Sequence, residues 1–251
     1  MSFLTGKKIV VMGVANKRSI AWGCAQALRE QGAEVIYTYQ NERMKKPLEK
    51  LLEGDEFLVE LDVASDESIA KGFDEIKEYA GEIHGVVHAV AYANKEDLQG
   101  DVTDISRQGY ALAQDISSYS LIAVTHYAKP ILAENSGIVT LTYLGAERAV
   151  PNYNMMGIAK AALEASVRYL AAELSPQKIR VNAISAGAIK TLAVTGVKDY
   201  QKLIQLSEDR TPDHVGVTIE EVGNVCAFLI SPLSGGIIGE TIFVDKGVHL
   251  S

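Results

Sequence analysis

A tyrosine and a lysine stand seven residues apart, at Tyr153 and Lys160, in a segment whose apolar spacing predicts an α-helix. Seven residues are almost two helical turns, so both side chains would project from one face, roughly 10 Å apart along the axis. A phenol that donates to a forming oxyanion, beside an ammonium that holds a ribose, would suit reduction of a carbonyl-conjugated substrate by a nicotinamide. The same spacing arises by chance in many amphipathic helices, so the hypothesis needs support from other segments.

The elements that must position this pair follow a regular alternation. Short β-branched segments alternate with longer segments of helical period, which is typical of β-α-β units and a parallel sheet. We expect strands at 8–12, 34–39, 57–62, 85–89, 137–141, 179–184 and 241–244. We expect helices at 19–31, 43–52, 66–79, 106–132, 153–174 and 218–229, the last opening with a capping box at Thr218 and Glu221. The prediction is an α/β fold with a single Rossmann-type doubly wound parallel sheet of about seven strands and helices on both faces. No linker or repeat marks a domain boundary, so 1–251 is expected to be one domain.

The composition limits the class of protein further. The chain has 251 residues, of which 47% are apolar, and a formal net charge of -8. An acidic chain is poorly suited to general nucleic-acid binding, which depends on neutralising phosphates with lysine and arginine. No apolar run is long enough to cross a bilayer, and Met1 leads directly into the first strand. Cys24 and Cys226 lie in apolar helical patterns and indicate no disulfide. We therefore expect a soluble, cytoplasmic protein without a nucleic-acid or membrane partner.

The turn after the first strand is a candidate phosphate site. Gly13 ends the strand, and the next helix is expected to begin at Ser19. Free N-H groups and the positive end of the helix dipole would then face a pyrophosphate. Of the usual G-x-G-x-x-G pattern only Gly13 is present, with Ala15 at the second position. An ordinary turn with Ser19 as N-cap explains the segment equally well.

The ends of the second and third strands bear on the choice of nucleotide. Gln40 is neutral and suits adenosine hydroxyls, which favours NADH. Three basic residues follow closely and leave NADPH open, although they also suit a solvated helix face: Arg43, Lys45 and Lys46. Asp62 and Val63 would place a carboxylate and a backbone amide near an adenine edge. Asp62 also suits a cap of the next helix.

Three further strand ends converge on the same edge of the predicted sheet. The fourth strand runs into the small residues of 88–93, which would let a nicotinamide ribose approach the backbone. The fifth strand ends beside Tyr143, ten residues before Tyr153. The sixth leads to Ile189, whose amide and carbonyl suit a carboxamide. Each feature has an ordinary structural explanation, but ligands of open α/β sheets collect at this edge.

With these residues in view, the chain resembles the NADH-dependent enoyl-acyl carrier protein reductases of bacterial fatty-acid synthesis, a divergent branch of the short-chain dehydrogenases/reductases. The resemblance is nearly end to end, most specific at 143–154 and reinforced at 115–120 and 180–187. In most short-chain dehydrogenases the tyrosine lies four residues before the lysine, a place held here by Met156. The longer spacing from Tyr153 to Lys160 separates the enoyl reductases from their ketone-reducing relatives.

The resemblance implies a mechanism. Reduced nicotinamide would deliver hydride to the β-carbon of a trans-2-enoyl thioester, leaving an enolate. Tyr153 would hydrogen-bond the thioester oxygen as charge builds there, and Lys160 would hold the nicotinamide ribose. Tyr143 would orient substrate or assist proton delivery, two roles that the residues do not separate.

The resemblance also implies binding residues, and no metal. The cofactor contacts would be Gly13, Ser19, Ile20, Gln40, Asp62, Val63, Val90, Lys160, Ile189, Lys190, Thr191, Leu192 and Ala193. Substrate contacts would be Ala93, Tyr143 and Tyr153. A mobile substrate lid is implied at about 191–210, with its inner side lined by Leu192, Ala193, Val194, Val197 and Leu203.

The implied partners are an acyl carrier protein bearing an enoyl chain and three further copies of this chain. A carrier of this kind is acidic, so a local basic patch must offset the charge of the enzyme, and Lys198 and Lys202 are spaced for one face of a lid helix. A solvated helix face explains these two lysines equally well. The homotetramer would form through the long helices expected at 106–132 and 153–174.

Two alternatives differ in function. A ketone or alcohol dehydrogenase on the same fold would need a tyrosine at Met156, and a nucleotide-sensing module would need no tyrosine pair.

The chain departs from the family pattern at three positions, with Tyr92 in place of a phenylalanine, Ala188 in place of a proline and Lys246 in place of a glycine. We expect neither Ala188 nor Lys246 to touch the chemistry.

Overall fold

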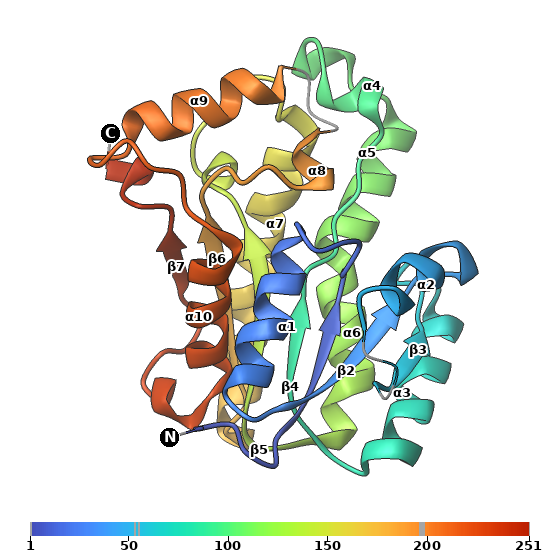
Figure 1. Cartoon of the computed structure of the whole chain (residues 1–251). Helices are drawn as coiled ribbons and strands as arrows, with labels where there is room; N and C mark the ends of the chain where they lie inside the picture. The colour runs from blue at the N-terminus through green and yellow to red at the C-terminus, as the bar shows by residue number, and fades with distance from the viewer. Residues whose placement is uncertain (1, 53, 55, 196–198, 251) are drawn as a thin grey trace.

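A seven-stranded parallel sheet forms the centre of the computed structural model, which describes residues 2–52, 54, 56–195 and 199–250 (Figure 1). The strand order is β3-β2-β1-β4-β5-β6-β7, and every neighbouring pair is parallel. The strands are β1 Lys8–Met12, β2 Glu34–Tyr39, β3 Leu58–Glu60, β4 Ile83–His88, β5 Leu132–Thr142, β6 Arg180–Ala186 and β7 Thr241–Val244. The order reverses direction between β1 and β4, which confirms the doubly wound Rossmann-type sheet expected from the sequence.

Ten α-helices are assigned in the described part of the chain, together with shorter helical turns. They are α1 Ile20–Glu30, α2 Glu42–Glu49, α3 Asp66–Ala80, α4 Lys95–Leu98, α5 Arg107–Gln114, α6 Ser120–Ala128, α7 Asn154–Leu174, α8 Leu192–Thr195, α9 Tyr200–Arg210 and α10 Ile219–Ile230. Thr218 caps α10, and its side chain and that of Glu221 form the expected capping box. No helix in the described residues is long and apolar enough to span a membrane.

The helices cover both faces of the sheet. α1 and α10 pack against one face with the help of Leu48 from α2, and α3, α6 and α7 pack against the other. The central strands β1 and β4 are almost wholly buried between these layers, since Val10 and Val86 face one helical layer while Val11 and Val87 face the other. Each such side chain contributes about 1.5–3 kcal/mol by leaving water. Both layers therefore hold the sheet edge, and the residues on it, in a fixed place.

The single long helix expected at 106–132 is wrong. The segment contains α5, a π-helical turn at Asp115–Tyr119, α6 and a short turn at Lys129–Ile131 that leads into β5. The π turn inserts a residue into the helical register and directs Ser117 and Ser120 inward, where both are fully buried and hydrogen-bonded. The α-helix ends before Pro130, because the proline nitrogen carries no N-H for the hydrogen bond that a helix interior needs.

Candidate active site

The strand ends that were expected to carry function share one edge of the sheet. Met12 of β1 is level with His88 of β4, which is level with Thr140 of β5. Thr142 of β5 is in turn level with Ser185 of β6. The segments beyond these ends, together with α8 and α9, lie at the top of the molecule in Figure 1. This is the edge, beside the reversal of strand order, where open α/β sheets bind ligands.

Tyr143 and Tyr153 meet at this edge. Tyr143 directly follows β5, and Tyr153 is the N-cap of α7, one residue before the helix begins rather than inside it as expected. Their ring centroids are 4.9 Å apart and the ring planes are inclined at 70°. Burial raises the pKa of both phenols, and the proximity of Tyr143 raises that of Tyr153 further, because two neighbouring phenolates would repel each other. Both phenols therefore stay protonated at neutral pH and can donate hydrogen bonds.

Two glycines make the approach of the rings possible. A Cβ added to Gly145 would lie 2.6 Å from the ring of Tyr153 and 3.3 Å from that of Tyr143. A Cβ on Gly157, in the first turn of α7, would lie 2.7 Å from the Gly145 carbonyl oxygen. Gly157 also donates its N-H to the Tyr153 carbonyl oxygen, 2.7 Å away. The helix can therefore begin directly against the turn that follows Tyr143.

Lys160 is buried on α7, seven residues after Tyr153. Its side chain is on α7, and Nζ donates to the carbonyl oxygen of Leu141 at the end of β5, 2.7 Å away. Burial lowers the pKa of Lys160 to about 8, and the charge of Glu164 opposes this shift. Met156, which holds the place of the tyrosine in ketone-reducing relatives, packs in a hydrophobic cluster with Met155 and Ala159. The phenol nearest to Lys160 along the helix is thus Tyr153.

A buried polar layer lies beneath this site, and sequence reasoning missed it. His88 Nδ1 is 3.0 Å from Thr140 Oγ1, and His88 Nε2 is 2.9 Å from Ser120 Oγ. Burial, and to a lesser extent the charge of Lys160, lowers the pKa of His88 to about 3, so the ring is neutral. Histidine at the end of an otherwise apolar strand was the only local signal of this layer.

The turn after β1 has the geometry of an anion site. Gly13 has a φ of 89°, and a Cβ there would lie 2.1 Å from the carbonyl oxygen of Ala89, so only glycine fits where β1 and β4 end. Ser19 is the N-cap of α1 as expected, but its hydroxyl donates to the Asn16 carbonyl oxygen instead of accepting from the first turn. The N-H groups that begin α1 at Ile20 are therefore not satisfied by the capping side chain.

Gln40 and Asp62 come together at the ends of β2 and β3. Gln40 Nε2 donates to Asp62 Oδ2 at 3.3 Å. Asp62 does not cap α3, since Ser65 does so, and its other oxygen accepts the N-H of Ala64. Val63 is buried beside this pair. Among the basic residues that follow β2, Lys45 forms ion pairs with Glu42 and Glu49.

The remaining predicted contacts lie in two loops. After β4, Val90 and Ala93 are half-buried, and Ala93 packs against the cluster that contains Tyr153. The Ser117 hydroxyl holds this loop, because it accepts the N-H of Tyr92 and donates to its carbonyl oxygen. After β6, the carbonyl oxygen of Ile189 already accepts the N-H of Thr191 at 2.7 Å, while Lys190 is exposed. Of Leu192 and Ala193 the structure describes the backbone, which forms the start of α8.

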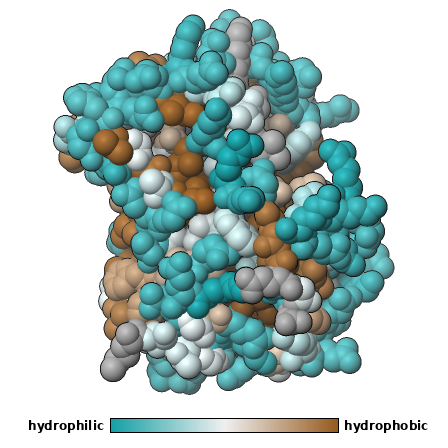
Figure 2. Space-filling view, in the orientation of Figure 1, coloured by the Kyte–Doolittle hydropathy of each residue, from teal (hydrophilic) through white to brown (hydrophobic). Residues whose placement is uncertain are grey.

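The segment expected to be a lid contains α8 and α9. Val194 and Leu203 are half-buried, and Lys202 is exposed near Asp199. The expected positions Val197 and Lys198 lie outside the described residues. Figure 2 shows a strip of hydrophobic side chains just below α9, framed by hydrophilic ones.

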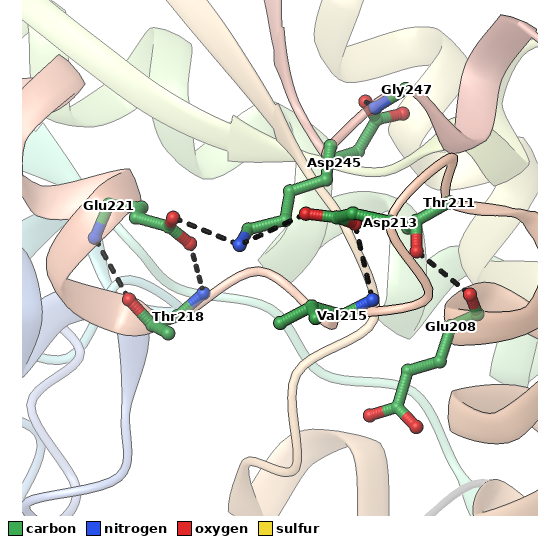
Figure 3. Close-up of polar contacts among 9 residues, drawn as sticks. Glu208, Thr211, Asp213, Val215, Thr218, Glu221, Asp245 and Gly247 are labelled. Carbon is green, nitrogen blue, oxygen red and sulfur yellow. Dashed lines mark hydrogen bonds and ion pairs between the residues drawn. The ribbon is translucent and has the colours of Figure 1, made fainter.

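A polar network fixes the end of α9 (Figure 3). The ammonium of Lys246 lies 3.2 Å from Glu221 at the start of α10 and 3.9 Å from Asp213 in the loop after α9. Asp213 also accepts the N-H of Val215. Lys246 has a φ of 52°, a left-handed conformation that glycine adopts without strain, in keeping with the glycine that the resemblance leads us to expect at this position. The lysine accepts that backbone conformation and adds an ion-pair link to the loop after α9.

Comparison with known proteins identifies the fold and the family. The family model described as Enoyl-(Acyl carrier protein) reductase matches residues 13–249. The chain is 69% identical over 249 residues to the Enterococcus faecalis protein named enoyl-[acyl-carrier-protein] reductase [NADH] FabI, covering 99% of this chain and 100% of that one. It is 51% identical over 250 residues to a Staphylococcus aureus protein named enoyl-[acyl-carrier-protein] reductase [NADPH] FabI, covering 98% of each.

Among solved structures, the Bacillus cereus enoyl-acyl carrier protein reductase with NADP+ and indole naphthyridinone superposes with a TM-score of 0.97 at 50% identity, over 100% of this chain and 99% of that chain. The sequence match and the superposition both extend over nearly the whole length of this chain. The chain therefore belongs to the enoyl-acyl carrier protein reductase family.

Proposed function

We propose that this protein is an NADH-dependent enoyl-acyl carrier protein reductase of bacterial fatty-acid synthesis, which reduces the trans-2 double bond of an enoyl thioester. The observation that carries the proposal is the pair of protonated phenols, Tyr143 and Tyr153, set in contact at the sheet edge, with Lys160 buried on the helix that Tyr153 caps. The family membership of the whole chain supports the same activity.

The nucleotide would lie along the sheet edge. The pyrophosphate would face the first turn of α1 between Gly13 and Ile20, where the capping side chain leaves N-H groups unsatisfied. The adenosine end would reach Gln40 and Asp62, and the nicotinamide end would lie among Lys160, Val90 and the segment 189–193. A side chain on Gly13 would meet the Ala89 carbonyl oxygen, so this position of the path has to be glycine. No metal takes part in this proposal.

The residues of the chain then act on the substrate. Reduced nicotinamide supplies a hydride for the β-carbon of the enoyl thioester. Tyr153 would donate to the thioester oxygen as negative charge develops there, because its raised pKa keeps the phenol protonated. Lys160 would hold the ribose and place positive charge near the developing enolate. Tyr143 would pack against the Tyr153 ring and keep its hydroxyl directed at the thioester, which would lie beside Ala93.

Preference for NADH over NADPH is part of the proposal. A phosphate on the adenosine ribose would meet the carboxylate of Asp62, which is bound to Gln40. Lys45 is paired with two glutamates, which reduces its attraction for a phosphate. Relatives named for each nucleotide exist, so the choice of nucleotide differs between similar proteins.

We include a lid, a carrier site and an assembly in the proposal. Residues 191–210 would cover the acyl chain, since α9 lies next to the hydrophobic strip of Figure 2. Lys198 and Lys202 would dock the acidic carrier, because Lys202 is exposed on α9. Charge reversal at both should raise KM for the carrier-linked substrate more than for a coenzyme A thioester. An equal rise for both substrates would refute docking through these lysines.

A homotetramer and a cytoplasmic location complete the proposal. Large hydrophobic side chains are exposed on α5, the π turn, α6 and α7, the helices expected at the interfaces: Tyr110, Tyr119, Ile122 and Tyr169. Light scattering should give a particle of four times the 27.1 kDa of the chain. Cys24 and Cys226 are buried free thiols, in keeping with a reducing compartment.

The reaction is tested by following the absorbance of reduced nicotinamide with a trans-2-enoyl thioester and, separately, with a β-ketoacyl thioester. We expect turnover of the enoyl substrate alone, faster with NADH than with NADPH. Turnover of the ketone alone would indicate a ketone reductase. Tight nucleotide binding without turnover of either substrate would indicate a sensing module.

A further inference from the structure

Glu164 is a buried carboxylate behind the proposed active site. It lies on α7 one turn after Lys160 and is 8% exposed. Thr142, the last residue of β5, donates its hydroxyl to Glu164 Oε1 at 2.7 Å. Buried carboxylates are costly unless they are paired and hydrogen-bonded, so this position calls for a compensating charge.

Lys160 is the buried cation on the same face of α7, and its charge favours the ionised form of Glu164. Residues four apart on a helix lie one above the other on the same face, and here both side chains face the end of β5. The ammonium of Lys160 donates to Leu141, and the carboxylate of Glu164 accepts from the next residue, Thr142. Two successive residues of one strand thus hold the lysine and the glutamate of one helix.

The other groups around the pair do not replace this partner. His88 of β4 is the titratable group that faces Lys160 from the sheet, and it is neutral. Tyr153 is protonated. The charges of Arg168 on α7 and of Glu147 in the turn after β5 also act on the pKa of Glu164. Both of these side chains are exposed, so water screens their charges. Burial raises the pKa of Glu164, and the hydrogen bond from Thr142 and the charges of Arg168 and Lys160 oppose this shift. Among the described residues, Glu164 is the group whose charge raises the pKa of Lys160.

We propose that Glu164 is a positioning residue for Lys160: its carboxylate, held by Thr142 one helical turn from the lysine that Leu141 holds, keeps the lysine ammonium charged for the cofactor ribose. Burial alone drives Lys160 toward the neutral amine, because a buried cation loses its hydration. An uncharged amine would hold the ribose hydroxyls less tightly and would give no charge stabilisation to an enolate. The inference rests on the proposed function, since it assigns Lys160 to the cofactor.

The test is the pH dependence of kcat/KM for NADH between pH 6 and 9.5, with an enoyl thioester as substrate. In the wild type we expect an alkaline limb near the pKa of Lys160, about 8. Glu164→Gln keeps the volume and the oxygen that accepts from Thr142 but removes the charge. It should move the limb about one pH unit lower, with about a tenfold loss at pH 9 and little change at pH 6.

Controls separate this role from a structural one. Glu173→Gln, an exposed glutamate on the same helix, should leave the limb unchanged. Glu164→Asp shortens the side chain by one methylene and so moves the charge away. The alkaline limb of kcat/KM should then shift to lower pH by less than in the Gln variant. This second variant provides the test if the Gln variant does not fold. A folded Gln variant with an unchanged limb, or one with an equal loss at every pH, would overturn the inference. An inactive wild type would instead refute the proposed function.

Discussion

The ring of Tyr153 stands edge-on to the ring of Tyr143, with centroids 4.9 Å apart. Edge-to-face aromatic pairs of this kind contribute about 0.5–1.5 kcal/mol beyond the area they bury. The contact joins the end of β5 to the start of α7, two segments that are ten residues apart in the sequence. The position of the Tyr153 hydroxyl therefore depends on its neighbours as well as on its own helix.

Gly145→Ala should impair activity by displacing the Tyr153 ring, since the added Cβ would lie 2.6 Å from it. We expect kcat/KM for the enoyl thioester to fall roughly 100-fold, the size of effect that a displacement of about 1 Å can cause. Steady-state kinetics measure this loss. Gly236→Ala, where a Cβ would meet no atom within 4 Å, should keep wild-type kinetics. Wild-type activity in the Gly145 variant would show that the ring position is unimportant.

His88→Asn should reduce the acid sensitivity of the fold. His88 is neutral in the folded state, with a pKa of about 3, but binds a proton near its ordinary pKa of 6.5 when unfolded. Its contribution to stability is therefore present above pH 6.5 and is lost as the pH falls. Between pH 7 and pH 5 this group alone should remove about 2 kcal/mol from the free energy of unfolding.

Urea unfolding of both proteins at pH 7 and pH 5 measures this difference. The wild type should lose about 2 kcal/mol more than the Asn variant over that range. Asparagine retains groups that can hydrogen-bond Thr140 and Ser120, so the variant is expected to fold. Equal losses in the two proteins would mean that His88 does not stay neutral in the folded state.

Substitutions at Lys246 should separate backbone strain from the ion pairs. Both Lys246→Gly and Lys246→Ala remove the pairs with Glu221 and Asp213, but only glycine adopts a φ of 52° without strain. The Ala variant should be less stable than the Gly variant by about 1 kcal/mol, as measured by urea unfolding. Equal stabilities would contradict the assigned strain.

Asp62→Asn should relax the preference for NADH. Removing one charge close to a phosphate changes its free energy of binding by about 1 kcal/mol near water, or about fivefold. The ratio of kcat/KM for NADPH to that for NADH should rise by that factor. Asp66→Asn, an exposed aspartate at the start of α3, provides the matched control. An unchanged ratio in the Asp62 variant would place the adenosine elsewhere.

Much of the fold could be predicted because its signals are local. The bounds of β1, β2 and β7 agree with those expected, since each is a short run rich in β-branched or aromatic residues. The capping box at Thr218 is likewise a contact within four residues. Tyr143, Tyr153 and Lys160 could be placed together because parallel strands end at one edge and a helix follows.

The remaining features depend on contacts between distant residues. The π turn brings Ser117 to Tyr92, 25 residues earlier. The helical periodicity of the segment does not predict this hydrogen bond. His88 and Thr140 are 52 residues apart, and Thr142 and Glu164 are 22 apart. Single polar residues of this kind resemble surface residues in the sequence, and only packing shows that they are buried.

Replacement of Tyr153 by phenylalanine tests the central claim most directly. With NADH and a trans-2-enoyl thioester, Tyr153→Phe should lower kcat roughly 100- to 1000-fold, the cost of losing one donor to a developing oxyanion. The dissociation constant for NADH, measured by fluorescence titration, should stay unchanged, because the variant retains the aromatic ring and Lys160. A variant that keeps wild-type kcat would contradict the assignment of Tyr153 as the hydrogen-bond donor to the thioester.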